Sequence, residues 1–333
     1  MTKKQKILSI SVAAYNLGSM IEDNLKSFCR KEYIDDIEVL IVDDGSTDDT
    51  CERATKYAER YPNSIKIIKQ KNAGPGATVN TGIKHATGKY FRMVDGDDWV
   101  NPAGFAKLIK TLKTIDADLI LSNYSTVNES TGAKEVVPLP DLPTNELLSF
   151  ENLDFRYATL IRMHHAVFRT SIMKKHVHLN NGFYTDSEYT FFPTPYLKNL
   201  YYLNETVYMY RIGMAGQSTS IEKMRTNVNR HGIILDELLN YYEQSAKTLN
   251  PHAKQYLATQ VENFASDHIG IWLLVGGKAA QQNLPNVFKH IKTTSPDIYN
   301  ILSQNTRSKT LLRSHFLLTR PLAKAFRRRS EGK

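Results

Sequence analysis

Between residues 7 and 94, short apolar segments alternate with segments that favour helix, and this alternation constrains the fold more than any other feature of the chain. The apolar segments are rich in β-branched residues, as buried strands of a parallel sheet are. Strands that alternate with helices are joined by right-handed crossovers into a mostly parallel sheet. The expected strands cover residues 7–13, 38–42, 65–69, 90–94 and 117–122, and the expected helices cover residues 19–30, 51–60 and 102–114, with a further helix that ends near residue 86.

The predicted fold class is therefore α/β, with a Rossmann-like, mostly parallel sheet flanked by helices. Residues 222–303 have apolar residues spaced near the helical period, which predicts a C-terminal helical extension. A boundary between the two regions is expected near residues 215–225.

Acidic residues directly follow two of the expected strands. Asp43 and Asp44 end the second strand, and Asp95, Asp97 and Asp98 follow the fourth. The carboxyl ends of parallel strands share one edge of the sheet, where open α/β folds bind ligands. Crowded carboxylates repel one another unless a cation or strong donors compensate, and Mg²⁺ typically uses one or two carboxylates together with substrate phosphates. The ordinary alternative is turn chemistry, because Asp-Gly-Asp-Asp is also a good turn sequence.

The carboxylate of Asp44 suits a further role, since it can accept a hydrogen bond from the N3–H of a pyrimidine base. The alternative is local, because Ser46 and the acids after it supply caps for the following helix. Asn80 follows a segment rich in Gly and Pro and is expected at the same edge of the sheet.

Four motifs, in this order and spacing, resemble the family-2 glycosyltransferases of the GT-A fold. They are the segments 12–16, 42–48, 72–82 and 94–98. The resemblance is specific over about residues 5–125 and continues more weakly to about residue 220. It implies transfer of a sugar from a nucleoside diphosphate donor, usually UDP-linked, with inversion at the anomeric carbon.

The resemblance also implies roles for the residues in these motifs. Ala13 and Tyr15, in the motif that ends at Asn16, would line the base of the nucleotide. Asp44, helped by Asp43, would hold the uracil.

The remaining motifs would serve the sugar diphosphate. Asp95 would meet the ribose or the metal, and Asp97 would bind the Mn²⁺ or Mg²⁺ ion that bridges the two phosphates. Asn80 would belong to the same nucleotide-sugar site. Such an ion stabilises the charge that develops on the departing nucleoside diphosphate.

The acceptor hydroxyl must lose a proton as it attacks, so a carboxylate general base is expected opposite the leaving group. Residues 182–189 occupy the place where related enzymes carry a Glu-Asp pair, and here Thr185 replaces the first member. Asp186 is the predicted base and Glu188 is the second choice. The alternative is that Asp186 caps the helix that follows.

The segment 210–218 resembles the loop that closes over the diphosphate in related enzymes. Arg211, Gln217 and Ser218 offer donors there, and the two glycines permit movement. A glycine-rich connection between domains explains the same residues equally well.

Two further features leave alternatives open. His164 and His165 would contact the acceptor or the leaving phosphate, or they are ordinary histidines of the interior or surface. Val79 stands where many relatives carry an arginine, so any role of that arginine is lost or supplied elsewhere.

Composition is that of an ordinary globular protein, with 41% hydrophobic and 23% charged residues among 333. The two cysteines lack the spacing of a zinc site and give no disulfide framework. Neither a signal-peptide pattern nor an apolar run of membrane-spanning length is visible. We therefore expect a cytoplasmic location.

Residues 305–333 carry nine Lys and Arg against one Glu, and so hold nearly all of the net charge of +9. Leucines and phenylalanines lie between these cations, a mixture that suits an anionic membrane surface. Pro321 predicts a break near Thr319. The alternative is a solvated, partly disordered tail. Nucleic acid is not expected as a partner, because no recognition motif accompanies the charge.

These observations predict a catalytic domain at residues 1–220, with nucleotide-sugar binding in 1–125 and the acceptor side in 126–220. A helical domain at 221–304 and a basic amphipathic tail at 305–333 complete the chain. The expected partners are a UDP-sugar donor, a glycan or lipid-linked acceptor and the inner face of the cell membrane, and a homo-oligomer remains open. The alternative function is a catalytically silent subunit that binds a nucleotide sugar or glycan as a scaffold.

Overall fold

The structure is a computed structural model that describes residues 5–139, 142–153, 161–182, 184–214 and 220–330. Its contacts divide the chain into two compact units, Met1–Met214 and Ala215–Lys333. The division lies close to the boundary expected from the sequence, and each unit is described separately.

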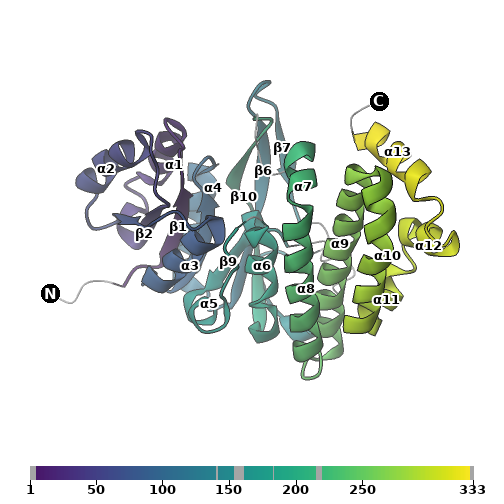
Figure 1. Ribbon diagram of the computed structural model, residues 1–333. Coiled ribbons are helices and arrows are strands. Elements are labelled where there is room, and N and C mark those ends of the chain that lie inside the picture. Colours follow the sequence, from purple (N-terminus) through teal and green to yellow (C-terminus); the bar gives the residue numbers. More distant parts are fainter. Residues whose placement is uncertain (1–4, 140–141, 154–160, 183, 215–219, 331–333) are drawn as a thin grey trace. The chain divides into compact units, whose positions relative to one another are not determined.

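One mixed sheet forms the centre of the first unit, in the order β3-β2-β1-β4-β9-β6-β10-β5, with β7 added to β6 and β8 added to β10. Its first part is entirely parallel, because β1 pairs with both β2 and β4 and β2 pairs with β3. The elements of this part are β1 (Leu8–Ala14), α1 (Met20–Phe28), β2 (Ile37–Asp43), α2 (Thr50–Arg60), β3 (Ile65–Lys69), α3 (Pro75–His85) and β4 (Tyr90–Asp95). The predicted α/β class with a mostly parallel sheet flanked by helices is confirmed (Figure 1).

The second part of the sheet mixes directions. Strand β9 lies antiparallel between β4 and β6, whereas β6 and β10 are parallel. The elements here are β5 (Trp99–Val100), α4 (Pro102–Thr114), β6 (Leu119–Asn128), β7 (Lys134–Val137), β8 (Leu147–Ser149), β9 (Ala166–Arg169), α5 (Thr170–His176), α6 (Thr185–Phe191) and β10 (Asn199–Ile212). Short 3₁₀ turns occur at Ile34–Asp36, Phe150–Asn152, Met163–His165 and Thr194–Tyr196.

Strand β6 continues beyond the residue 122 expected for its end. Its polar second half stays extended because β10 pairs with it as far as Asn128. The side chain of Asn123 accepts a hydrogen bond from the Tyr202 hydroxyl at 2.5 Å, which satisfies a polar group inside the sheet. Tertiary pairing therefore overrides the weak local strand signal.

The carboxylate of Glu38 on β2 is buried in the sheet. It accepts hydrogen bonds from the Ser9 hydroxyl at 2.6 Å, from the Thr87 hydroxyl at 2.8 Å and from Lys66 at 3.1 Å. Burial alone would raise the pKa of Glu38, but these hydrogen bonds outweigh it and lower the pKa below its ordinary value. Glu38 thus ties β1, β2 and the turn before β4 together.

The second unit is helical (Figure 1). Helix α9 contacts α7, α8, α10, α11 and α13, and it is buried on nearly every side from Tyr256 to Leu274. The elements are α7 (Ile221–Thr226), α8 (Val228–Ser245), α9 (Pro251–Val275), α10 (Gly277–Thr294), α11 (Pro296–Leu302), α12 (Thr306–Arg313) and α13 (Thr319–Ser330). None of the helices in the described residues combines the length and apolar character needed to cross a membrane.

Residues 305–330 form helices instead of an irregular tail. A turn at 314–318 separates α12 from α13, which begins at the predicted break at Thr319. Both helices belong to the same compact unit as α7–α11.

We expect Glu38→Gln to lower the free energy of unfolding by about 3 kcal/mol at pH 7, because the buried network loses the negative charge and one of the two acceptor oxygens of Glu38. The folded-state pKa of Glu38 is below its unfolded value, so this stabilisation is present above about pH 4.3 and disappears as the pH falls through the folded pKa. Urea unfolding of the wild type and of Glu38→Gln across pH 3–7 measures this difference in the free energy of unfolding. Glu52→Gln, at an exposed carboxylate, is the matched control.

Candidate functional site

The carboxyl edge of the parallel strands brings together the ends of β1, β2 and β4, which carry several of the predicted site residues. The register pairs Ala13 with Val42 and with Asp95, and pairs Ala14 with Asp43. Tyr15, directly after β1, is 50% exposed. The acids at the end of β2, the acids at the end of β4 and the end of β1 therefore share one edge, as the sequence predicts.

The loop after β1 is fixed to the loop after β2. Asn16, which has a positive φ of 50°, accepts from the Thr47 backbone N–H at 2.8 Å, and its own N–H donates to the Ser46 hydroxyl at 3.1 Å. The Thr50 hydroxyl accepts from the backbone N–H of Leu17 at 2.8 Å. Polar residues expected to cap α2 therefore also shape the loop that carries Tyr15.

Asp43 and Asp44 are both buried and both hold backbone. Asp43 accepts from the Ser46 N–H at 3.0 Å. Asp44 accepts from the backbone N–H groups of Ala73 at 3.0 Å and Gly74 at 2.8 Å, and from the Gln70 amide at 2.7 Å. Asp44 thereby fixes the segment that leads into α3, and its predicted contact with a uracil base stays a prediction.

The acidic turn after β4 forms a tight cluster. Asp95, Asp97 and Asp98 offer ligand oxygens that all lie within 4.8 Å of one another. Gly96 makes the turn possible, because a Cβ there would lie 2.6 Å from the Ala13 carbonyl oxygen. The loop after β1 can therefore approach the acids closely only while this position lacks a side chain.

Asp98 anchors the cluster from inside and is only 1% exposed. Its carboxylate accepts from the Tyr208 hydroxyl at 2.6 Å and from the Arg211 backbone N–H at 2.7 Å. Asn24 on α1 donates to the carbonyl oxygens of Asp95 at 3.1 Å and Asp98 at 2.8 Å. The predicted site residues did not include Asp98, although it is the third acid of the same motif.

The acids raise one another's affinity for protons. Burial, together with the charges of Asp97 and Asp186, raises the pKa of Asp95 to about 7. Burial raises the pKa of Asp97, and burial with the charges of its neighbours raises that of Asp98 well above the ordinary value. A divalent cation would relieve this repulsion, and carboxylate oxygens are the ligands that Mg²⁺ and Mn²⁺ accept. The donor set therefore fits such an ion.

Arg211 braces the cluster from β10. Its guanidinium donates to the Asp97 carbonyl oxygen at 2.8 Å and pairs with Glu129 at 2.6 Å and Asp23 at 3.3 Å. It also lies 4.8 Å from the centre of the Trp99 ring. These contacts place Arg211 beside the acids, and its predicted contact with a diphosphate is untested. Gln217 and Ser218, predicted for the same role, lie outside the described residues.

Asp186 lies in the first turn of α6, where Tyr184 takes the N-cap position. The Asp186 side chain is exposed, but protein surrounds it on several sides and this burial raises the pKa of its carboxyl. Its charge contributes to the raised pKa of Asp95, so the two carboxylates lie within electrostatic reach of each other. Asp186 thus combines an exposed side chain with a charge that acts on Asp95 of the acidic cluster.

Glu188 is 0% exposed, and its two oxygens accept from the Asn180 backbone N–H at 3.0 Å and side-chain amide at 2.8 Å. Asn80 continues this connection, since its amide donates to the Leu179 carbonyl at 2.7 Å and accepts from the Leu179 N–H at 2.9 Å. Asn180 in turn packs against α3 so closely that a Cβ on Gly76 would lie 1.7 Å from its carbonyl oxygen. Asn80 and Glu188 therefore fix the segment that carries Asp186.

His164 and His165 are buried in an aromatic group. The His164 ring lies 4.4 Å from the Tyr210 ring and 4.8 Å from the Tyr208 ring. Burial lowers the pKa of His164 well below its ordinary value and that of His165 to about 3, so both rings are neutral at pH 7. The fully buried Arg92 donates to the His164 carbonyl and lies 5.3 Å from the Tyr208 ring. These positions favour the packing role that the sequence left open for the histidines.

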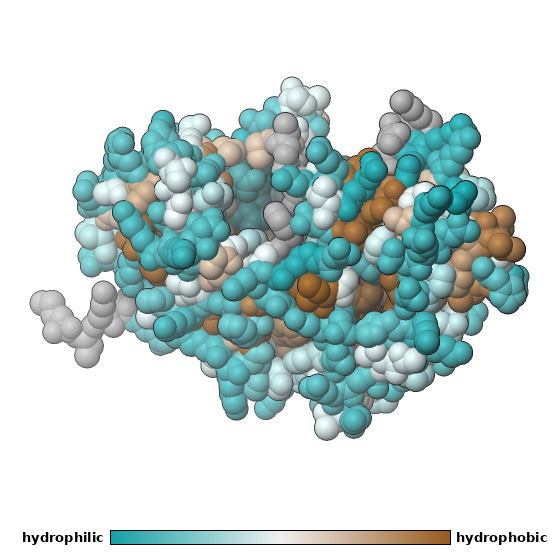
Figure 2. Space-filling view, viewed as in Figure 1, coloured by the Kyte–Doolittle hydropathy of each residue, from teal (hydrophilic) through white to brown (hydrophobic). Residues whose placement is uncertain are grey.

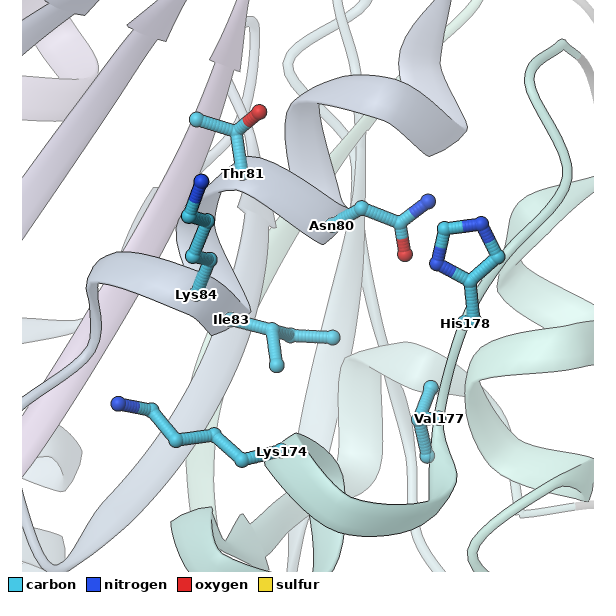
Figure 3. Close-up of a pocket in the computed structure, with 7 residues that line it drawn as sticks. All are labelled: Asn80, Thr81, Ile83, Lys84, Lys174, Val177 and His178. Carbon is cyan, nitrogen blue, oxygen red and sulfur yellow. The ribbon is translucent and has the colours of Figure 1, made fainter.

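A separate pocket of about 460 Å³ opens beside α3 and α5. Figure 3 shows Lys84 and Lys174 from these two helices, with His178 facing Asn80. The residues that line it are Asn80, Thr81, Ile83, Lys84, Lys174, Val177 and His178. None of the acids of the cluster belongs to this lining, whereas Asn80, expected from the sequence to lie with them, does.

Comparisons with known proteins identify the family and the fold. The family model described as "Glycosyl transferase family 2" matches residues 9–178. The putative glycosyltransferase EpsH of Bacillus subtilis is 26% identical over 293 residues, which is 84% of this chain and 81% of the relative.

Two solved structures share the fold. The S. aureus TarS 1–349 structure in complex with UDP has a TM-score of 0.63 at 19% identity and covers 98% of this chain and 92% of its own, and the same protein has been solved with UDP-GlcNAc. The mannosyltransferase PcManGT from Pyrobaculum calidifontis, in complex with GDP-Man and Mn²⁺, has a TM-score of 0.53 at 14% identity and covers 98% and 88%. At these identities the likeness establishes the fold alone.

We expect Tyr208→Phe to weaken Mn²⁺ binding by about tenfold, because the Tyr208 hydroxyl holds the Asp98 carboxylate and the Asp95 backbone N–H, and outer hydrogen bonds that orient metal ligands typically contribute 10–100-fold to metal affinity. Tyr202→Phe is a matched control, since Tyr202 also donates to a side chain and accepts from a backbone N–H, but it does so at Asn123 and Leu139. Calorimetric titration with Mn²⁺ measures both variants. Equal affinities would show that Tyr208 does not organise an ion site.

Proposed function

The chain belongs to glycosyl transferase family 2, and on that premise we propose that it moves a sugar from a UDP-linked donor onto a hydroxyl group of a cell-surface glycan, teichoic-type polymer or glycolipid, with inversion at the anomeric carbon. The observation that carries the proposal is the pairing of the Asp95–Asp98 cluster with a solvent-accessible Asp186 beside it. An acidic cluster and a separate carboxylate base are what metal-assisted glycosyl transfer requires.

Asp95 and Asp97 are the proposed ligands of a Mn²⁺ or Mg²⁺ ion. Such an ion would stabilise the negative charge that develops on the departing diphosphate. Asp98 has both of its oxygens engaged by Tyr208 and Arg211 in the structure, so we assign it to holding the turn. Arg211 holds the Asp97 carbonyl from the other side and keeps the two ligating acids at a constant spacing.

Asp186 is the proposed general base. A base works best when its pKa lies nearer the working pH, and the surroundings of Asp186 raise its pKa in that direction. We do not assign this role to Glu188, because a carboxylate with no exposed surface cannot reach an acceptor hydroxyl without leaving Asn180.

The nucleotide is proposed to lie at the ends of β1 and β2. Tyr15 offers an exposed aromatic side chain to a base, and Ala13, at the end of β1, would line it. Asp43 and Asp44 would hold the uracil, directly or through the loop that Asp44 fixes. The UDP and UDP-GlcNAc complexes of TarS support the choice of a uridine nucleotide.

Residues 305–333 are proposed to bring the enzyme to the inner face of the cell membrane, where a lipid-linked acceptor would lie. These residues include nine Lys and Arg but only one Glu, and this positive charge supports the contact.

A catalytically silent, sugar-binding subunit is the second candidate. Val79 favours it, because it is buried and offers no donor where many relatives carry an arginine. The complete set of acids favours catalysis, so turnover decides between the two candidates.

The first experiment is calorimetric titration with UDP, GDP, CDP and dTDP, each with Mn²⁺ and with EDTA, followed by hydrolysis assays of the matching sugar donors. Metal-dependent UDP binding with slow hydrolysis of a UDP-sugar is the expected result. No binding of any nucleotide would reject the proposed donor site.

Asp186→Asn should lower turnover by at least about 100-fold while UDP affinity stays unchanged, because general-base catalysis contributes about 10²–10⁴-fold. Glu188→Gln is the comparison, and it should lower thermal stability while turnover stays within tenfold of the wild type. Steady-state kinetics at saturating donor measure both. A larger loss of turnover in Glu188→Gln than in Asp186→Asn would indicate that Glu188 is the base.

Asp97→Ala should abolish turnover and the metal-dependent part of UDP binding together, since both depend on the same ion. UDP titration with and without Mn²⁺ measures the second effect. Asp23→Ala, which removes an exposed partner of Arg211, should leave metal-dependent binding within a few-fold of the wild type. Metal-dependent UDP binding that survives in Asp97→Ala would remove Asp97 from the ligand set.

A further inference from the structure

The second unit contains a pocket surrounded by cations. It has a volume of about 370 Å³ and lies beside the turn between α9 and α10, with α13 forming its other wall. The residues that line it are Gly277, Arg320, Ala323, Lys324, Arg327 and Arg328. No carboxylate belongs to this lining, and among the described residues none of its four cations forms an ion pair.

Arg327 is held in place at this pocket. Its guanidinium donates to the Val275 carbonyl, the last residue of α9. A Cβ on Gly276 would lie 1.7 Å from the same guanidinium, and Gly276 has a positive φ of 64°. The turn between the two helices is therefore shaped to accept Arg327, which fixes one wall of the pocket.

Four like charges around one cavity repel one another unless an anion compensates. Arginine and lysine both recognise phosphate, arginine through paired N–H donors and lysine as a point charge. A phosphate group is therefore the ligand chemistry that the pocket fits.

The turn before α13 presents apolar side chains to solvent. Leu317 is 75% exposed and Leu318 is 45% exposed. The two preceding residues have positive φ values, 47° at His315 and 63° at Phe316, and the Phe316 ring packs 5.5 Å from the Phe288 ring. Phe316 thus anchors the turn and leaves the two leucines outside. Figure 2 shows hydrophobic residues at the edge of the molecule where α12 lies in Figure 1.

We propose that α13 and the turn before it dock on an anionic phospholipid bilayer, with a lipid phosphate in the basic pocket and Leu317 and Leu318 in the acyl region. The inference rests on the proposed membrane contact of residues 305–333 and adds the lipid group and the residues that bind it. A free phosphate would satisfy the cations but leave the leucines exposed, whereas a bilayer satisfies both.

The test is co-sedimentation of the full chain with vesicles of phosphatidylcholine alone and with an equal part of phosphatidylglycerol. We expect binding only to the second kind. Lys324→Gln combined with Arg328→Gln should weaken it by about 30-fold, from roughly 1 kcal/mol for each cation near the surface. Leu317→Ser combined with Leu318→Ser should weaken it by at least about 100-fold, because the two changes remove six carbon groups and about 0.8 kcal/mol is lost for each one no longer buried.

Matched controls separate the pocket from general charge and apolarity. Lys247→Gln with Lys289→Gln removes the same charge from exposed positions of the same unit, and Ile233→Ser with Ile301→Ser removes exposed apolar side chains. Both should bind within threefold of the wild type. The proposal would be overturned if the control variants lost as much vesicle binding as the pocket variants. It would also be overturned if the wild type did not bind vesicles, or if it bound inorganic phosphate in calorimetry but no vesicles.

The rate of UDP-sugar hydrolysis, measured in solution without vesicles, tests the proposed activity independently of membrane binding. The pocket variants should hydrolyse the donor at the wild-type rate, because no residue of the acidic cluster is changed. A wild type that binds vesicles but turns over no donor would reject the proposed activity and leave the docking surface intact.

Discussion

The repulsion among Asp95, Asp97 and Asp98 is the constraint around which the first unit is organised. Their ligand oxygens lie within 4.8 Å of one another, and the structure compensates with donors from distant parts of the chain. Tyr208 and Arg211 come from β10 and Asn24 comes from α1, so the acids can stay together only when the sheet and the helix beside it are both in place. Formation of the cluster is therefore a consequence of complete folding, which also means that an ion would meet a preorganised set of ligands.

A second connection serves the proposed base. Asn80 on α3 and Glu188 on α6 form hydrogen bonds with Leu179 and Asn180, and so fix the segment directly before α6. Asp186 follows within the first turn of that helix. The helix that follows the Gly- and Pro-rich segment thus helps to position a carboxylate about 100 residues later in the sequence. Asn80 and Glu188, which the sequence suggests as site residues, here hold the backbone of the segment that carries Asp186.

The sequence predicts the parallel half of the sheet well, because the apolar strands and the helices between them are local patterns. It also predicts which edge carries the acids, since strand direction follows from the alternation. It does not predict that Arg211, Asn80 and Glu188 are already engaged with other parts of the protein, because residue type shows what a side chain can donate or accept and not with whom it pairs. The sequence also does not predict that β9 lies antiparallel between β4 and β6, because a strand of four residues shows neither its direction nor its partners.

Strand β9 has a consequence for how such a chain can diverge. It pairs with β4 on one side and β6 on the other, and so it closes the sheet independently of the length of chain between the end of β6 and its own start. Insertions or deletions in the connections from β7 to β8 and from β8 to β9 can therefore accumulate without moving the acidic turn after β4. Those connections can change in length from one relative to another while the edge that carries the acids is inherited unchanged.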